Sequence, residues 1–101
     1  MSDFERFRNE QLQDSEFLEI FLDRLPVSDI SKVIVGYRKE KDISQKELAK
    51  LTGIHQTDIS RLEHCEGNPS LKTINKLAKG LGMAVRIQLV PIESILNELE
   101  E

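Results

Sequence analysis

The chain has 101 residues and a net charge of −4, which fits one compact domain with short arms and excludes two full domains. An acidic average argues against nucleic acid as a partner, but the charge is segregated. Residues 1–30 carry eight acidic and three basic side chains, residues 31–90 carry eleven basic and six acidic ones, and residues 91–101 carry four acidic and no basic ones. A basic centre between two acidic ends suggests two different kinds of partner.

Composition excludes further classes of protein. No apolar run approaches the roughly 18 residues of a membrane-spanning helix, and the charged N-terminus lacks the apolar centre of a secretory signal. The single cysteine, Cys65, cannot form an internal disulfide and fits a reducing compartment. We therefore expect a cytoplasmic protein that does not contact a membrane.

Residues 1–27 are expected to form an acidic, phenylalanine-rich arm. Apolar residues from Phe17 to Leu25 recur with helical spacing, and Pro26 is expected to end that helix. Aromatic side chains are frequent anchors of protein interfaces, so the arm is a candidate protein-binding segment. Packing of the arm on its own domain is the alternative. The candidate contact residues are Phe4, Phe7, Phe17, Leu18, Phe21 and Leu22.

Residues 28–82 are expected to form four helices. Apolar positions at helical spacing mark the first, with Ser28 as its cap and Asp42 in a left-handed conformation after its end. Ser44 begins the second with the spacing of a capping box, and Gly53 is expected to end it.

The third helix is expected over about 55–65, and the fourth begins with Pro69 at its first position or Ser70 as its cap. The apolar residues expected to face inward are Leu48, Ala49, Leu51, Ile54, Ile59, Leu62, Leu71, Ile74, Leu77, Ala78 and Leu81.

Residues 83–90 alternate between apolar and polar side chains, which predicts a single β-strand. One strand cannot satisfy its own backbone groups, so we expect it to pair with the same strand of a second copy. The side chains expected at this dimer interface are Met83, Val85, Ile87 and Leu89. Residues 91–101 are expected to form a short acidic tail helix.

Two short helices joined by a glycine turn have the plan of a helix-turn-helix. The stretch ISQKELAKLTGIHQTDISRLE, residues 43–63, resembles the phage-repressor (Cro/C1, or XRE) helix-turn-helix, and the resemblance continues to Gly82. It implies a mainly α-helical fold with a Cro/C1-type helix-turn-helix bundle. Together with the patterns described above, we expect this bundle to carry an N-terminal helical arm and one C-terminal strand that pairs across a dimer. The stretch EQLQDSEF, residues 10–17, resembles the leader of HigA-type antitoxins. That family implies a RelE- or HigB-like mRNA nuclease as partner and repression of the antitoxin's own operon.

In such a domain the recognition helix enters the major groove, where Gln pairs well with adenine and Arg with guanine. The candidate base contacts are Gln56, Thr57, Arg61, Ser60 and His55, of which the resemblance favours the first three. The candidate phosphate contacts are Ser44 and Gln45, by resemblance, and Lys39, Lys41, Lys46 and Lys72 as general cations. The resemblance also implies a structural ion pair between Arg38 and Glu63.

Several of these residues have a simpler interpretation. Arg61 could be a solvated charge, His55 an exposed neutral turn residue, and the lysines of the fourth helix a solvated face. Asp58, an acid where DNA is expected, is interpreted as a residue that favours a helix start. His64 beside Cys65 lacks further ligands at metal-binding spacing, and Cys65 lacks a positioned base for nucleophilic chemistry.

The sequence therefore predicts a homodimeric repressor of operator DNA that is also an antitoxin of a RelE-like nuclease and regulates its own operon. The alternative is a stand-alone XRE-family repressor, of phage or chromosomal origin, without a toxin. No acid–base cluster, phosphate loop or nucleophile predicts an enzyme, and no metal, cofactor or small-molecule substrate is expected.

Overall fold

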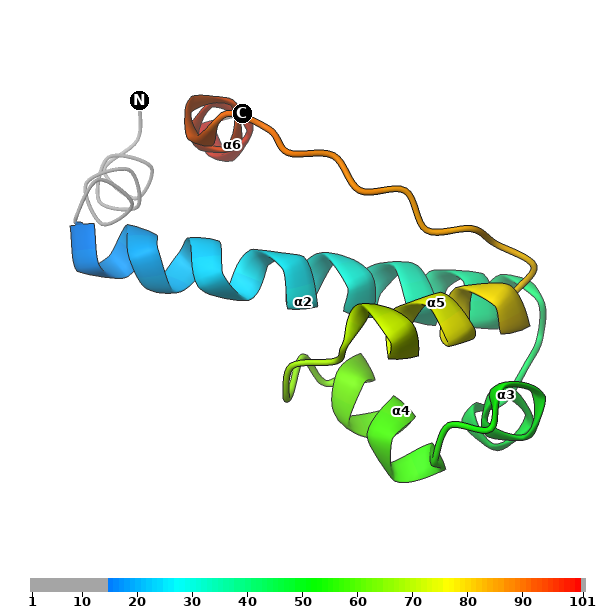
Figure 1. The fold of residues 1–101 in the computed structure, drawn as a ribbon. Helices are drawn as coiled ribbons and strands as arrows, with labels where there is room; N and C mark the ends of the chain where they lie inside the picture. The colour runs from blue at the N-terminus through cyan, green and yellow to red at the C-terminus, as the bar shows by residue number, and fades with distance from the viewer. Residues whose placement is uncertain (1–14, 101) are drawn as a thin grey trace. The chain divides into compact units, whose positions relative to one another are not determined.

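The computed structural model describes residues 15–100, and every element in that range is a helix (Figure 1). The helices are α2 (Ser15–Glu40), α3 (Gln45–Thr52), α4 (Gln56–Glu63), α5 (Leu71–Gly80) and α6 (Ile92–Glu100). Of the described residues, 25–86 form one compact unit, and 15–24 with 87–100 belong to a second. None of the described helices is long and apolar enough to span a membrane. Two predicted contact residues, Phe4 and Phe7, lie outside the described range.

Helix α2 continues through Pro26, so the predictions that Pro26 ends a helix and that Ser28 caps the next one are wrong. Proline removes one backbone donor and costs a helix interior about 3 kcal/mol. The apolar spacing nevertheless continues beyond it, and Val27, Ser31 and Ile34 are buried along one stripe. Each fully buried aliphatic side chain stabilises the fold by about 1.5–3 kcal/mol, so tertiary packing outweighs the local cost.

The junction of α2, α3 and α4 follows the local chemistry of the sequence. Asp42 adopts a φ of +55° after the end of α2. The Ser44 hydroxyl accepts a hydrogen bond of 3.0 Å from the N–H of Glu47. Gly53 has a φ of +76° and donates its N–H to the Ala49 carbonyl at 2.9 Å. The predicted left-handed position, N-cap and C-cap are therefore confirmed.

Helix α5 begins with a side-chain cap of the same kind. The Ser70 hydroxyl accepts a hydrogen bond of 3.1 Å from the N–H of Thr73. Of the two predicted ways to start this helix, the structure has Ser70 as the cap rather than Pro69 at the first helical position.

Four helices contribute to one apolar core in residues 25–86. The side chains that are at most 1% exposed are Ile34 from α2, Leu48 from α3, Ile59 from α4, Leu77 from α5 and Leu81 just after it. Leu51 and Leu71 are 62% and 63% exposed, so the prediction that they face inward is wrong. Each of these short helices meets the core along a narrow stripe that does not include them.

Helices α3 and α5 approach each other closely at Gly80. A Cβ atom added to Gly80 would lie 2.5 Å from Cγ2 of Thr52 and 3.4 Å from Cδ1 of Leu48. The Thr52 hydroxyl donates to the Leu48 carbonyl at 2.7 Å and accepts from the N–H of Ile54 at 3.2 Å. These bonds fix the Thr52 methyl group, so only glycine fits opposite it.

Residues 83–91 form neither helix nor strand, which corrects the strand predicted over 83–90. A strand requires a neighbour, and between Ala84 and Leu89 the backbone makes no hydrogen bond with any other described residue. The side chains predicted to lie at a dimer interface are all exposed, from 37% for Met83 to 94% for Leu89. The tail helix predicted after them is confirmed as α6.

Candidate nucleic-acid interface

Helix α4 presents a polar side opposite the core. Ile59 and Leu62 are buried and hold the helix against the domain. Of the five predicted base-contact residues, four are exposed (His55, Gln56, Thr57 and Arg61) and the fifth, Ser60, is half-buried. Asp58 is also exposed. It lies in the first turn, where a negative charge interacts favourably with the helix dipole. The helix thus has an apolar anchor and a polar surface of hydrogen-bonding groups.

Glu63, the last residue of α4, connects this helix to α2 and α3. Its carboxylate accepts hydrogen bonds from Nε and Nη2 of Arg38, both at 2.8 Å, and from Nε2 of Gln45 at 3.1 Å. Its backbone carbonyl accepts a bond of 3.0 Å from the hydroxyl of Ser31. Arg38 also donates to the carbonyl of Ile43 at 3.0 Å. These contacts fix where α4 lies on the domain.

The Arg38–Glu63 pair is largely removed from solvent, with side chains 15% and 6% exposed. Burial alone would raise the pKa of Glu63, but the hydrogen bonds from Arg38 and Gln45 and the charge of Arg38 lower it below its usual value. The hydrogen bond to Glu63 raises the pKa of Arg38, although burial opposes this. Both groups are therefore charged near neutral pH.

Two residues of this cluster make contacts that the sequence did not predict. Gln45 is a predicted phosphate contact, yet its side-chain amide is half-buried and bonded to Glu63. Ser31 was not predicted to have any role, although it is the only polar residue in the stripe from Val27 to Ile34 that is buried. A serine at an apolar position of a helical stripe is the signal that could have identified it.

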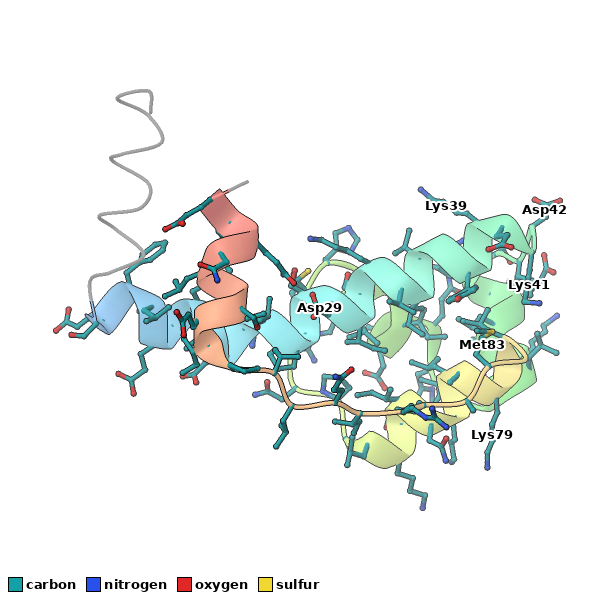
Figure 2. The ribbon with its side chains drawn as sticks, turned by 90° about the horizontal axis from the view of Figure 1, so that it is seen from above. Asp29, Lys39, Lys41, Asp42, Lys79 and Met83 are labelled. Carbon is teal, nitrogen blue, oxygen red and sulfur yellow. The ribbon has the colours of Figure 1, made fainter. Side chains whose placement is uncertain are left out.

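The predicted phosphate-contacting lysines fall into two groups. Lys39 and Lys41, together with Lys79, lie at one end of residues 25–86, where α2 and α5 end (Figure 2). Cations at the C-terminal end of a helix interact favourably with its dipole, so these charges have a local role. Lys46 and Lys72 lie in the first turns of α3 and α5, where a cation opposes the dipole. Helix stability therefore gives no reason for these two exposed charges.

Helix α4 ends in a Schellman motif. In this motif two backbone hydrogen bonds close the last turn, and the residue after the turn has a left-handed backbone conformation. The N–H of Cys65 donates to the Leu62 carbonyl at 2.9 Å, and the N–H of Glu66 donates to the Arg61 carbonyl at 2.8 Å. Cys65 is exposed and has a φ of +59°, a conformation that favours glycine.

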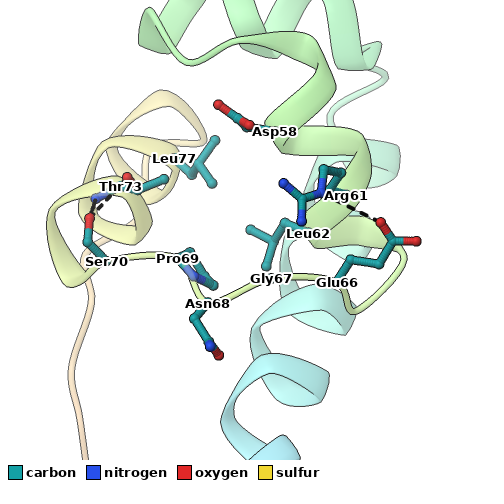
Figure 3. A pocket seen from close by; sticks show the side chains of 10 residues that line it. All are labelled: Asp58, Arg61, Leu62, Glu66, Gly67, Asn68, Pro69, Ser70, Thr73 and Leu77. Carbon is teal, nitrogen blue, oxygen red and sulfur yellow. Dashed lines mark hydrogen bonds and ion pairs between the residues drawn. The ribbon is translucent and has the colours of Figure 1, made fainter.

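The Arg61 side chain lies over this turn (Figure 3). Its Nε is 3.7 Å from Oε2 of Glu66, and its Nη2 is 3.6 Å from the position that a Cβ would take on Gly67. These residues border a cavity of about 240 Å³ between α4 and the start of α5, which Asp58 and Thr73 also line.

The described residues contain no group of three or more side chains suited to hold a metal ion. The ring of His64 has its own contact, because Nδ1 lies 2.7 Å from the carbonyl oxygen of Ser60.

Three comparisons bear on this site. A sequence model described as helix-turn-helix matches residues 36–87. The control protein C.SmaI of Serratia marcescens is 34% identical over 74 residues, which cover 69% of this chain and 87% of that protein. An uncharacterised HTH-type transcriptional regulator of Haemophilus influenzae is 34% identical over 86 residues, covering 85% of this chain and 84% of that one.

A solved structure, the toxin–antitoxin module from Streptococcus pneumoniae, contains a chain of similar fold. The TM-score is 0.57 at 29% identity, and the match covers 89% of this chain and 96% of that chain. Likeness of fold thus extends beyond the segment that the sequence model matches.

Proposed function

The chain belongs to the helix-turn-helix family of DNA-binding transcriptional regulators, and from this premise we propose that it is also the antitoxin of a toxin–antitoxin module. In this proposal, residues 28–82 bind operator DNA and repress the protein's own operon. The arm, residues 1–27, binds and neutralises a RelE- or HigB-like mRNA nuclease. The protein acts as a homodimer in the cytoplasm.

The observation that carries the proposal is the extent of the structural likeness. The helix-turn-helix sequence model matches residues 36–87, whereas the likeness to a chain of the Streptococcus pneumoniae toxin–antitoxin module covers 89% of this chain. The likeness therefore includes residues outside the DNA-binding segment. It supports an antitoxin more than a regulator that shares only the helix-turn-helix.

The described part of the arm has a surface suited to a basic protein. Phe17 is 42% exposed, Ile20 is 65% exposed, and Glu16, Glu19 and Asp23 lie on the same helix. An RNA-cleaving toxin needs a positively charged surface for its substrate. Exposed apolar anchors with acidic side chains on the same helix complement such a surface in charge.

The surface of α4 and the two helix-start lysines support DNA binding. Gln56 and Thr57 lie exposed in the first turn of α4, the part of a recognition helix that reaches base edges. Lys46 and Lys72, whose charges oppose the dipoles of their own helices, suit an external anion such as a phosphate. We expect Gln56→Ala to cost about 1–3 kcal/mol at one base pair, whereas Lys46→Gln should weaken binding to all sequences.

The proposed homodimer would cover apolar side chains that the single chain leaves exposed. Residues 83–90 carry Val85, Ile87 and Leu89 at alternating positions, with backbone groups available for pairing. The strand expected there would form only when a second copy supplies the neighbour. Analytical ultracentrifugation tests this directly, because Ile87→Asp should shift the protein toward the monomer.

Co-expression with the product of the neighbouring gene tests the antitoxin proposal. We expect the two proteins to co-purify and the toxicity of the neighbour to be suppressed. Phe17→Asp should weaken both effects, while Val33→Asp, which adds the same charge at an exposed apolar position in residues 25–86, should leave them unchanged. Toxicity that persists in the presence of the unaltered protein, with no complex, would contradict the proposal.

A stand-alone repressor is the second candidate. It is favoured by the match to the Haemophilus influenzae regulator, which also extends over 85% of this chain. A protein that binds its own promoter tightly but forms no complex with any neighbouring gene product would identify this alternative.

A further inference from the structure

We propose that Glu66 is a positioning residue of the DNA interface, which holds Arg61 over the α4–α5 turn and competes with DNA for its guanidinium group. This inference rests on the DNA-binding part of the proposed function. In this proposal Glu66 pairs with Arg61 when DNA is absent.

The end of α4 places these two residues together. A Schellman motif has two backbone hydrogen bonds, one of which spans more residues of the chain than the other. The side chains of the two residues joined by this wider bond lie close together and frequently make an apolar contact. Here these two positions are occupied by Glu66 and Arg61, joined by the N–H···O bond of 2.8 Å. The apolar contact is thus replaced by an ion pair, Nε to Oε2, of 3.7 Å.

Gly67 lies directly beside the guanidinium of Arg61. Nη2 of Arg61 is 3.6 Å from the position that a Cβ would take on Gly67, which is an ordinary van der Waals distance. The φ of +76° at Gly67 turns the backbone under the arginine side chain. Figure 3 shows Arg61 and Glu66 joined beside the Gly67 turn, at the edge of the cavity.

Charges around Arg61 make Glu66 its principal partner. Glu63, the other carboxylate near the end of α4, is occupied by Arg38 and Gln45. Asp58 lines the same cavity but forms no ion pair with Arg61 among the described residues, so the counter-charge of this guanidinium is Glu66.

The ion pair lowers the affinity of the surface for DNA. Arg61 and Glu66 are 57% and 60% exposed, so the pair is weak enough for a phosphate or base to displace Glu66. Until that happens, the negative charge of Glu66 repels the DNA backbone and neutralises the one arginine of α4. Any DNA that engages Arg61 must first separate the two groups.

The test is a double-mutant cycle, with the dissociation constant measured by fluorescence anisotropy at fixed low salt. The probes are a random-sequence duplex and a duplex of equal length that carries the protein's own promoter. Glu66→Gln retains the backbone bond and should tighten binding about two- to fivefold, the range expected for an exposed ion pair. The gain should vanish in the presence of Arg61→Ala, because Glu66 acts through Arg61.

Glu98→Gln in α6 removes the same charge from an exposed position and should leave both affinities unchanged. Binding that is not tightened by Glu66→Gln, or tightened equally without Arg61, overturns the inference. A response on the random duplex without any preference for the promoter overturns autoregulation and leaves the inference intact. Failure of the unaltered protein to bind either duplex overturns both.

Discussion

Residues 25–82 and residues 83–91 differ in how completely the chain determines its own structure. In the first region the ends of α3, α4 and α5 are closed by local bonds, and one core buries apolar side chains from four helices. In the second, apolar side chains are exposed, up to 94% for Leu89, and the backbone forms neither helix nor strand. Residues 25–82 are therefore stabilised by contacts within the region itself. Residues 83–91 also carry several apolar side chains, but these side chains are exposed rather than packed in a core.

The largest effect should come from the ion pair that holds α4. Glu63→Gln keeps the shape of the side chain but leaves the 15%-exposed Arg38 without its counter-charge. Removing one partner of a buried pair costs about 3–5 kcal/mol, so we expect about 3 kcal/mol in urea unfolding at pH 7. Glu98→Gln, at an exposed position, should change the free energy of unfolding by less than about 0.5 kcal/mol.

The same pair predicts a pH dependence. The pKa of Glu63 is lower in the folded protein than in the unfolded chain, where it is about 4.3. Its contribution is therefore complete above that value and is lost as the pH falls through the lowered pKa. The stability difference between the unaltered protein and Glu63→Gln should shrink in that acidic range. A difference that stays constant there would show that the carboxylate charge is not what stabilises the domain.

Gly80 provides the next test of the self-contained region. Gly80→Ala places a methyl group against the fixed Thr52 side chain and should destabilise the protein by about 1–3 kcal/mol. Gly36→Ala in α2 is the matched control, because nothing lies within 4 Å of the added atom. That variant should gain about 0.5–1 kcal/mol from higher helix propensity. If thermal unfolding shows that both substitutions stabilise, α3 and α5 do not pack as tightly as described.

A smaller effect, of opposite sign, is expected at Cys65. Its φ of +59° is costly for any residue with a Cβ, so Cys65→Gly should raise the stability by about 0.5–1 kcal/mol. Cys65→Ala removes the thiol but keeps the strain, and should not reproduce the gain. Equal melting temperatures for the two variants would argue against strain at this position.

The smallest effect on stability should come from the second region. Leu89→Ser removes an apolar side chain that is 94% exposed and should change the free energy of unfolding of the monomer by less than about 0.5 kcal/mol. If dilution-dependent unfolding shows a loss of more than about 1 kcal/mol at all concentrations, residues 83–91 contribute to the folded monomer. The contrast between the two regions would then be wrong.

The features that the sequence predicted correctly depend on neighbours in the chain. Ser44, Ser70, Gly53 and Asp42 each act within a few residues, so their residue types and spacing suffice to identify helix ends. The family resemblance supplied the Arg38–Glu63 pair, which joins residues 25 positions apart and has no local signal.

The predictions that failed depend on distant contacts. Local chemistry favours a helix end at Pro26, but burial of the stripe that begins at Val27 reverses that preference. The spacing of apolar residues shows which of them share one side of a helix, but not how much of that side the core covers. The prediction that Leu51 faces inward was wrong for this reason. The bonds of Ser31 and the fit at Gly80 exist only once α2, α3, α4 and α5 are assembled.

Pro26 also divides α2 into two parts with different exchange behaviour. The proline interrupts the ladder of helical donors, and the first buried side chain among the described residues of the helix follows directly at Val27. Opening the turns before Pro26 requires no disruption of the core, whereas opening those after it does. Amide protons of residues 27–38 should therefore exchange only when the whole domain unfolds, and those of residues 19–25 should exchange by local opening. A single continuous helix would then contain two independent folding units.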